Sequence, residues 1–353
     1  MVEQECKVSV IADWDADGVV SAAIILYAQH HRGKFPLAER VKPCLIPAGP
    51  RSIKKIAEEG LCWDIVVILD IPFTAEVEET IKHLRECGSK IYYFDHHSST
   101  IEAMRKLEDE YNVFVVVGRS PTSVVLQKFL EGLGVKLTPR LREFVKAVAV
   151  LEGGKRKPAK EEVAPGIINL AASISKALNQ LRDEQAWVKY VKWVSNPLPF
   201  EEIKVKVPSR EGEAGKKSLL KLGMEISSES DKRIKEAAMN LAMSSRNLGY
   251  IKFVDARGKW EGRGASALAS NIYKIVNMPV AVFVEKDDGS RLLIIRSGKG
   301  EAEKIMRKLY ESGIVEDIGG HRNIAVARVG SDVTERMLER ALRRASFEAA
   351  RES

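Results

Sequence analysis

Carboxylate and imidazole side chains follow three separate apolar segments in the first hundred residues, and side chains of these types are ligands of divalent cations. Carboxylates crowded together repel one another, so several of them in one place require a cation to hold them. Oxygen ligands with an imidazole suit manganese or magnesium better than zinc, which prefers sulfur and more nitrogen. The residues concerned are Asp13, Asp15, Asp17, Asp70, Asp95, His96 and His97.

The elements that must position these residues are short apolar segments rich in Val, Ile, Tyr and Phe, alternating with helix-like stretches. Strands are predicted at 7–12, 64–69, 90–94 and 113–117. Their near-continuous hydrophobicity is typical of parallel strands buried on both faces, which predicts an α/β domain with a doubly wound, mainly parallel sheet. Ligands of such a sheet bind beyond the carboxyl ends of the strands. An aspartate there can also cap a helix, but three clusters on successive strand ends favour a metal site.

Capping residues support the predicted helices of the first half. Thr74 precedes the helix 75–86, and Thr138 precedes the helix 140–152; a hydroxyl in this position accepts a hydrogen bond from the first helical turn. Further helices are predicted at 19–31, at 52–59, from Pro121 to Gly134 and within 167–194.

The second half of the chain predicts a smaller α/β domain. Asp288-Gly289 between two apolar runs predicts a β-hairpin. Around it, strands are predicted at 250–255 and 323–329, and helices at 265–275 and 301–311. The predicted organisation is a first domain 1–195, a connecting segment 196–244, a second domain 245–335 and a basic C-terminal helix or tail 336–353.

Length and composition agree with two globular domains. The chain has 353 residues, of which 45% are hydrophobic and 30% charged, and 56 Lys and Arg minus 49 Asp and Glu give a net charge of +7. This excess is compatible with a polyanionic partner without requiring one. No apolar run approaches the roughly 18 residues that cross a bilayer, and the N-terminus lacks a secretory pattern. We therefore expect a cytoplasmic protein without a membrane partner.

The cysteines give no sign of a metal site or a disulfide framework. Cys6, Cys44, Cys62 and Cys87 are scattered without any C-x-x-C spacing. We therefore expect reduced, buried thiols, which is the usual state of such cysteines in the cytoplasm.

Several motifs together resemble one family. FDHH (94–97), DWDADG (13–18) and ILD (68–70) resemble the DHH phosphoesterase superfamily, and the D-x-D-A-D-G form is similar to its RecJ-type nucleases, especially those of archaea. The second half agrees with the DHH-associated substrate domain, in the family's order. Its matching segments are WEGRGASALAS (260–270), IIRSGKG (294–300) and IGGH (318–321).

The resemblance implies a role for each residue of the acidic clusters. Asp13, Asp15, Asp70 and His96 would hold one or two manganese ions, or magnesium, with Asp70 as the bridge. Asp95 would orient its neighbours. His97 would face the scissile phosphate as hydrogen-bond donor or general acid, and Asp17 would cap a helix or support the ligands rather than bind the ion.

The resemblance also implies a phosphate-binding or nucleotide-binding site in the second domain. Glycines there allow close approach to the backbone, and a guanidinium binds phosphate. The residues expected to form it are Arg296, Ser297, Gly319, Gly320 and His321. The alternative is that Arg296 is a surface charge and that the glycines only form a turn.

Two positions depart from the family pattern. Glu152 stands where the family has an aspartate; it would ligate the same ion with a longer side chain, or it is only a charged residue at the end of a helix. Glu261 stands where RecJ-type proteins often have histidine. Neither departure removes the main ligand set.

The resemblance implies a metal-dependent phosphodiesterase that shortens single-stranded nucleic acid from one end, with metal-activated water as nucleophile. The substrate would lie between the domains, and replication or repair proteins would be partners. One alternative is a phosphodiesterase for short oligoribonucleotides, cyclic dinucleotides or a nucleotide bisphosphate. A second is a replication or repair scaffold without catalysis.

Overall fold

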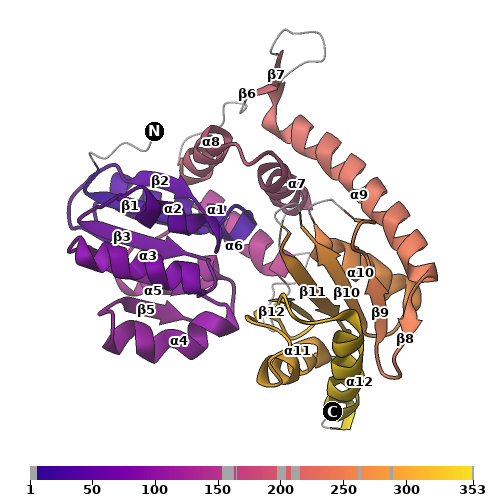
Figure 1. Cartoon of the computed structure of the whole chain (residues 1–353). Helices are drawn as coiled ribbons and strands as arrows, with labels where there is room; N and C mark the ends of the chain where they lie inside the picture. The colour runs from indigo at the N-terminus through magenta and orange to yellow at the C-terminus, as the bar shows by residue number, and fades with distance from the viewer. Residues whose placement is uncertain are drawn as a thin grey trace. The chain divides into compact units, whose positions relative to one another are not determined.

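The computed structural model describes residues 6–152, 163, 165–196, 204–207, 215–260, 264–286 and 289–351. The chain divides into two compact units, residues 1–227 and 228–353. Each unit contains its own sheet, seen in purple and in orange to yellow in Figure 1. No helix in the described part of the chain is long and apolar enough to cross a membrane.

The first unit is built on five parallel strands in the order β2-β1-β3-β4-β5. This confirms the predicted doubly wound parallel sheet. The strands are β1 (Val8–Ala12), β2 (Cys44–Pro47), β3 (Ile65–Leu69), β4 (Lys90–Asp95) and β5 (Phe114–Val117). Only β2 was not predicted, because its apolar segment is short and lies between Pro43 and Pro47; it is an edge strand, where proline is tolerated.

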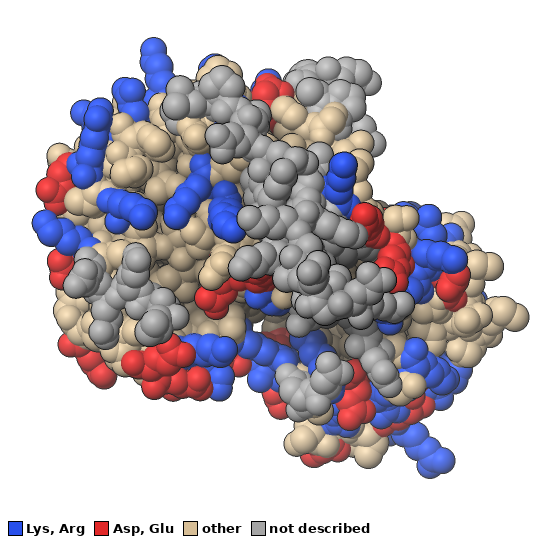
Figure 2. Space-filling view, turned by 90° about the horizontal axis from the view of Figure 1, so that it is seen from above, with Lys and Arg blue, Asp and Glu red and all other residues tan. Residues whose placement is uncertain are grey.

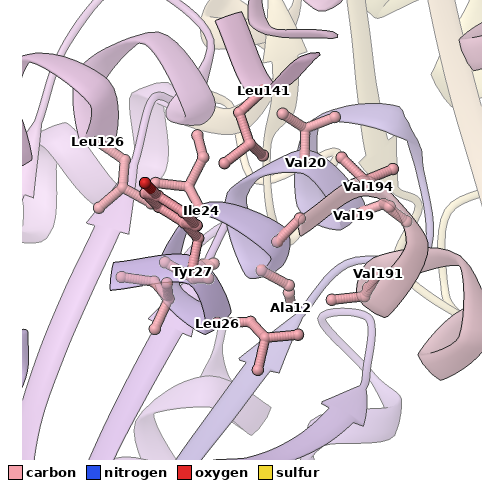
Figure 3. Close-up of a cluster of buried hydrophobic side chains, with 14 of the residues drawn as sticks. Ala12, Val19, Val20, Ile24, Leu26, Tyr27, Leu126, Leu141, Val191 and Val194 are labelled. Atoms are coloured by element: carbon pink, nitrogen blue, oxygen red, sulfur yellow. The ribbon is translucent and has the colours of Figure 1, made fainter. Parts of the chain in front are cut away.

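Helices cover both faces of this sheet, so its strands are buried on both sides (Figure 1). Along β1, Val8 and Val10 face one cluster, which Figure 3 shows in part, and Ile11 faces the other. The first face is covered by α1 (Ala16–Leu26), the π-helical turn Tyr27–His31, α5 (Thr122–Gly132), α6 (Pro139–Glu152), α7 (Pro165–Leu181) and α8 (Glu184–Ser195). The second face is covered by the 3₁₀ turn Ser52–Lys54, α2 (Lys55–Glu58), α3 (Ala75–Glu86) and α4 (Ser98–Asp109).

The predicted caps of two helices are confirmed. The Thr74 hydroxyl accepts a hydrogen bond from the Val77 amide at 3.4 Å, and the Thr138 hydroxyl accepts one from the Leu141 amide at 3.2 Å. Each satisfies a backbone donor that the first helical turn leaves without an intrahelical partner.

The cysteines form two disulfides, Cys6–Cys44 and Cys62–Cys87, so the expectation of reduced thiols is wrong. Each bond joins the amino ends of neighbouring strands: the first links β1 to β2, and the second lies beside the starts of β3 and β4. The partners are 38 and 25 residues apart in the sequence. Their proximity therefore comes from the sheet and not from local spacing.

The second unit has a mixed six-stranded sheet in the order β12-β13-β11-β10-β9-β8. The predicted hairpin pairs β10 with β11, although Asp288 of its turn lies outside the described residues. The strands are β8 (Arg246–Asn247), β9 (Lys252–Asp255), β10 (Val280–Glu285), β11 (Arg291–Arg296), β12 (Gly319–His321) and β13 (Ile324–Arg328). Its helices are α9 (Leu219–Met243), which begins before residue 228, α10 (Ala265–Val276), α11 (Glu301–Glu311) and α12 (Glu335–Arg351).

The two faces of the second sheet pack against different helices. Leu338 and Leu342 of α12 belong with residues of α11 to one apolar cluster, whereas Leu268 of α10 and Leu241 of α9 belong to the other. A short antiparallel pair, β6 (Lys204–Val207) with β7 (Gly215–Ser218), precedes α9. Glu261 lies outside the described residues.

Candidate metal centre

The carboxyl ends of β1 and β3 meet where the strand order reverses, which is where open α/β sheets bind ligands. Asp13 directly follows β1, and its amide donates to the Leu69 carbonyl of β3 at 3.3 Å. Asp70 directly follows β3, and its amide donates to the Phe94 carbonyl of β4 at 3.0 Å. The parallel register therefore places both aspartates at the same edge of the sheet.

The start of α1 holds two more carboxylates in defined positions. Asp15 is the N-cap of α1, and its Oδ1 accepts from the Asp17 amide at 2.9 Å and from the Gly18 amide at 3.0 Å. Asp17 is fully buried and accepts from the amides of Thr122 at 2.6 Å and Ser123 at 2.9 Å. Asp17 therefore caps α5, a helix more than a hundred residues away, in agreement with the capping role expected of it.

Asp70 lies at the centre of the cluster. Its side chain is 2% exposed, and its φ of +58° is a left-handed conformation that non-glycine residues seldom adopt. One carboxylate oxygen, Oδ1, accepts from the Thr122 hydroxyl at 2.8 Å and lies 3.3 Å from His96 Nε2. Strained backbone of this kind gathers at functional sites, where the surrounding structure enforces it.

Asp95 holds His97 in place and is itself held by Thr100. His97 Nδ1 lies 2.8 Å from Asp95 Oδ1, and the Thr100 hydroxyl donates to Asp95 Oδ2 at 2.5 Å. Burial raises the pKa of the Asp95 carboxyl, but the charge of His97 and the hydrogen bonds outweigh it, so the pKa is lowered overall. Burial acts to lower the pKa of His97, yet Asp95 raises it to about 9. His97 is therefore a protonated, oriented donor near neutral pH.

The neighbouring histidine differs in charge. His96 has a side chain only 7% exposed, and burial, followed by the charge of His97, lowers its pKa. A neutral imidazole can bind a cation, whereas a protonated one cannot. The two adjacent histidines are thus suited to the different roles that the sequence assigned to them: His96 to ligation, His97 to hydrogen-bond donation.

Glu152, the last residue of α6, belongs electrostatically to the same cluster. Burial, followed by the charge of Asp15, raises the pKa of its carboxyl to about 8. Burial and the charge of Asp15 also raise the pKa of Asp13 to about 7, and burial with four neighbouring carboxylates raises that of Asp70 well above its usual range. The fold therefore gathers carboxyls whose ionised forms are disfavoured by burial and by one another.

The donor set fits a hard divalent cation. One nitrogen or oxygen atom from each of Asp70, His96 and His97 lies within 4.8 Å of the others, with Asp70 and His96 as the candidate ligands and His97 as the hydrogen-bond donor beside them. The 3.3 Å between Asp70 Oδ1 and His96 Nε2 is close to the roughly 3 Å that separates adjacent ligands of an octahedral ion with bonds of about 2.1 Å. Carboxylates around a neutral imidazole are the ligands expected for manganese or magnesium.

Sequence reasoning missed the hydroxyl residues that support these carboxylates. Thr100 accepts from the Phe73 amide while donating to Asp95, and Thr122 donates to Asp70 while its amide donates to Asp17. The available signals were weak: Thr100 lies in the first turn of α4, and Thr122 follows Pro121 at the start of α5.

Arg182 was also missed, because it is distant in sequence from every motif. Its guanidinium carbon lies 4.9 Å from the centre of the Trp14 ring, and its charge opposes the rise in the pKa of Asp13. Trp187, five residues further on, donates from Nε1 to the Asp13 carbonyl at 3.2 Å. The α7–α8 junction therefore supports the loop that carries Asp13 and Asp15.

The second unit contains the predicted phosphate-binding residues. Arg296 Nη1 donates to the carbonyls of Ser297 at 2.7 Å and Asn323 at 2.6 Å. Ser297 is fully buried, and its hydroxyl accepts from the Ala302 amide at 3.0 Å, which supports the first turn of α11. The contact of these residues with substrate stays a prediction.

Glycines form the adjacent strand β12. Gly320 has a φ of +113°, and a Cβ there would lie 3.1 Å from the Ala325 Cα and closer still to the Ile324 carbonyl. Only glycine fits this position. Gly319 and His321 flank it in β12, where Gly319 pairs with Val326 and His321 with Ile324.

Comparison with known proteins gives a fold likeness only. No family model and no curated protein matches the sequence. RecJ in complex with Mn²⁺ from Thermus thermophilus has a TM-score of 0.58 at 16% identity over 99% of this chain and 53% of that one, so this chain spans about half its length. The chain therefore shares its fold with this RecJ structure.

Two further solved structures share this fold. A DHH domain described as belonging to a family of ribosomal proteins has a TM-score of 0.59 at 14% identity, over 98% of this chain and 86% of that one. The pGpG-specific phosphodiesterase PggH from Vibrio cholerae has a TM-score of 0.52 at 13% identity. The match covers 97% of this chain and 100% of the PggH chain. All three solved structures therefore match this chain in fold over both of its units.

Proposed function

We propose that this protein is a metal-dependent phosphodiesterase that shortens single-stranded DNA or RNA from one end. The observation that carries the proposal is the gathering of Asp13, Asp15, Asp70, His96 and Glu152 at one edge of a parallel sheet. Burial and neighbouring carboxylates raise the pKa values of the Asp13, Asp70 and Glu152 carboxyls. Such a cluster is stable as a set of charged groups only around a cation. The similarity of the D-x-D-A-D-G motif to RecJ-type nucleases supports the choice of substrate.

These five residues would hold one or two manganese ions, with magnesium as the alternative. When bound, divalent ions activate water for in-line attack and neutralise charge on the phosphoryl oxygens. The chain itself supplies His97, whose Nδ1 is fixed by Asp95, and Asp95 raises the pKa of the ring. His97 can therefore donate a hydrogen bond to a phosphoryl oxygen, or a proton to the leaving oxygen.

The second unit would bind the terminal nucleotide through Arg296, the glycines of β12 and His321. A guanidinium binds phosphate oxygens in a fixed geometry, and glycine lets a ligand approach the backbone. Lys and Arg are scattered over the face shown in Figure 2, with Asp and Glu among them. The proposal therefore depends on these local sites and not on a uniformly basic surface there.

A second candidate function is hydrolysis of short oligonucleotides or dinucleotides. The observation that favours it is the likeness to PggH, which extends over the whole of that chain and so includes both units. The same metal residues would serve both functions, so only the length of the preferred substrate separates them.

Digestion of single-stranded DNA and RNA, each labelled at the 5′ or the 3′ end, tests the proposal with manganese and with a chelator. We expect metal-dependent shortening from one end, with pGpG competing weakly against the long strand. Asp70→Asn removes one ligand charge, and Asp109→Asn, on the exposed last residue of α4, is the matched control. Efficient pGpG cleavage without shortening of long strands would favour the second function, and no cleavage by the folded protein would refute both.

A further inference from the structure

Two cysteines and a histidine gather at the amino edge of the first sheet, the edge opposite the carboxylate cluster. Cys62 lies in the loop before β3, and Cys87 is the C-cap of α3, just before β4. His83 lies four residues before Cys87 on α3, so both side chains project from the same face of that helix. The cluster is therefore separated from the candidate metal centre by the length of the strands.

The three side chains are within reach of a single ion. His83 Nε2 lies 3.6 Å from Cys87 Sγ and 4.0 Å from Cys62 Sγ, and the three ligand atoms all lie within 4.8 Å of one another. Cys62 is exposed, whereas His83 and Cys87 are half-buried, so solvent reaches the cluster. His83 Nε2 also lies 3.0 Å from the Leu61 carbonyl, which holds the ring next to the sulfurs.

The donor chemistry differs from that of the carboxylate cluster. Two thiolates and an imidazole are the ligands that zinc prefers, and a zinc site with three protein ligands completes its tetrahedron with water. In the structure the two sulfurs are joined as a disulfide. A disulfide offers no thiolate, so the site depends on the oxidation state of this pair.

We propose that reduction of the Cys62–Cys87 disulfide by a dithiol creates a zinc site made of Cys62, His83 and Cys87. The reductant's two thiols become a disulfide, and the two cysteines receive the two electrons and two protons. Zinc then displaces those two protons to solvent as it binds the thiolates. The imidazole turns from the Leu61 carbonyl to the ion.

The second disulfide provides an internal comparison. Cys6 and Cys44 also lie at the amino edge of the sheet, but among the residues that the structure describes they belong to no group of three candidate ligands. Opening this bond would leave two thiols without a histidine between them. Zinc affinity is therefore expected at one disulfide and not at the other.

Cobalt titration tests the proposal, because cobalt reports thiolate ligation by its absorption. The full chain is reduced with a dithiol, freed of it under anaerobic conditions and titrated with Co²⁺. We expect thiolate-to-cobalt charge transfer and the intense visible bands of one tetrahedral ion per chain, both abolished by Zn²⁺. The oxidised chain should show neither, although its carboxylate cluster remains free to bind cobalt.

Three variants assign the signal. The double variant Cys62→Ser, Cys87→Ser should lose it, whereas Cys6→Ser, Cys44→Ser should retain it. His83→Ala keeps all four cysteines, so it tests the site even if the double variant does not fold. The cobalt affinity of His83→Ala should be lower than that of the wild type by about tenfold or more. Absence of the signal from the reduced chain, its survival in Cys62→Ser, Cys87→Ser, or an unchanged affinity in His83→Ala would each overturn the proposal.

Discussion

Asp70 combines a strained backbone with a buried carboxylate beside other carboxylates. Asparagine tolerates the left-handed conformation and can still accept the hydrogen bond from Thr122. We therefore expect Asp70→Asn to fold and to lose more than about a hundredfold in activity, because it lacks the ligand charge. Without metal it should melt at a higher temperature than the wild type at pH 8, since it removes repulsion.

Steady-state cleavage assays and thermal melts check this prediction together, with Asp109→Asn measured alongside. Substantial activity in a folded Asp70→Asn protein would exclude Asp70 as a ligand.

The raised pKa values make the stability of the metal-free protein depend on pH. Folded Asp13, Glu152 and His97 titrate near 7, 8 and 9, whereas unfolded carboxyls titrate near about 4 and histidine near about 6.5. Between these limits the folded state binds more protons than the unfolded state, so stability falls as pH rises. We expect the melting temperature without metal to fall steadily from about pH 5 to about pH 9.

Thermal melts in a chelator across this range provide the measurement. His97→Gln should reduce the slope above about pH 6.5, where the imidazole adds to the two carboxyls, and reduce it most above about pH 8, where the imidazole is the last of the three groups to titrate. A melting temperature that rises with pH in the chelator would contradict the electrostatics of the site.

Arg296 belongs to substrate binding in the proposed function. Its guanidinium carbon lies 5.4 Å from the centre of the Tyr273 ring, and its hydrogen bonds hold the carbonyls of Ser297 and Asn323. We expect Arg296→Ala to raise KM by about tenfold with little change in kcat, because the proposed role of the residue is to contact bound substrate and not the reacting atoms. The KM of Arg296→Lys, which keeps the charge, should lie between those of the wild type and Arg296→Ala. Equal losses in kcat and kcat/KM would place Arg296 in the transition state.

At the scale of elements, the close packing of α1 against the end of β1 determines where Asp13 lies. A Cβ on Gly18 would lie 2.7 Å from the Asp13 carbonyl carbon and 2.8 Å from its amide nitrogen. Gly18→Ala must therefore push the helix away from this loop. We expect it to destabilise the protein by about 1–3 kcal/mol and to weaken manganese binding by about tenfold or more.

Manganese titration and denaturant unfolding measure both effects. Gly132→Ala is the control, because a Cβ at this last residue of α5 would meet nothing within 4 Å. Wild-type manganese affinity in Gly18→Ala would mean that the α1 contact does not position the ligands.

Most of the first sheet could be predicted because its strands carry the signal themselves. Continuous apolar runs ending in Asp13, Asp70 and Asp95 identify strands, and parallel strands place their carboxyl ends at one edge. The edge strand β2 lacked such a run. The supports of the site were beyond prediction for another reason: the Asp17–Thr122 and Trp187–Asp13 contacts join segments that no local pattern relates.

The cysteines illustrate the same limit. His83 and Cys87 show helical spacing, but Cys62 reaches them only through the order of β3 and β4 in the sheet. A search for C-x-x-C therefore misses this cluster, in which three candidate ligands of two residue types lie together. Tertiary structure, and not spacing along the chain, creates this cluster.

At the scale of the whole molecule, metal binding should be visible as stability. An ion that binds only the folded state stabilises it by mass action, by about 2.7 kcal/mol at a concentration of 100 Kd. We expect manganese at that level to raise the melting temperature of the first unit by about 5–10 °C, and the chelator to reverse the change. Asp109→Asn should respond like the wild type. A scaffold without a working site would show no response.

The hydrogen bonds from the amides of Thr122 and Ser123 to Asp17 also set an order of events during synthesis. They join residues 105 and 106 positions apart. A nascent chain carries Asp13, Asp15, Asp70 and His96 well before the ribosome adds these two amide donors, and α6 with Glu152 follows later still. The growing polypeptide can therefore complete the candidate metal centre only after α5 has left the exit tunnel. A chain that ends before residue 122 would carry most of the candidate ligands but lack their support.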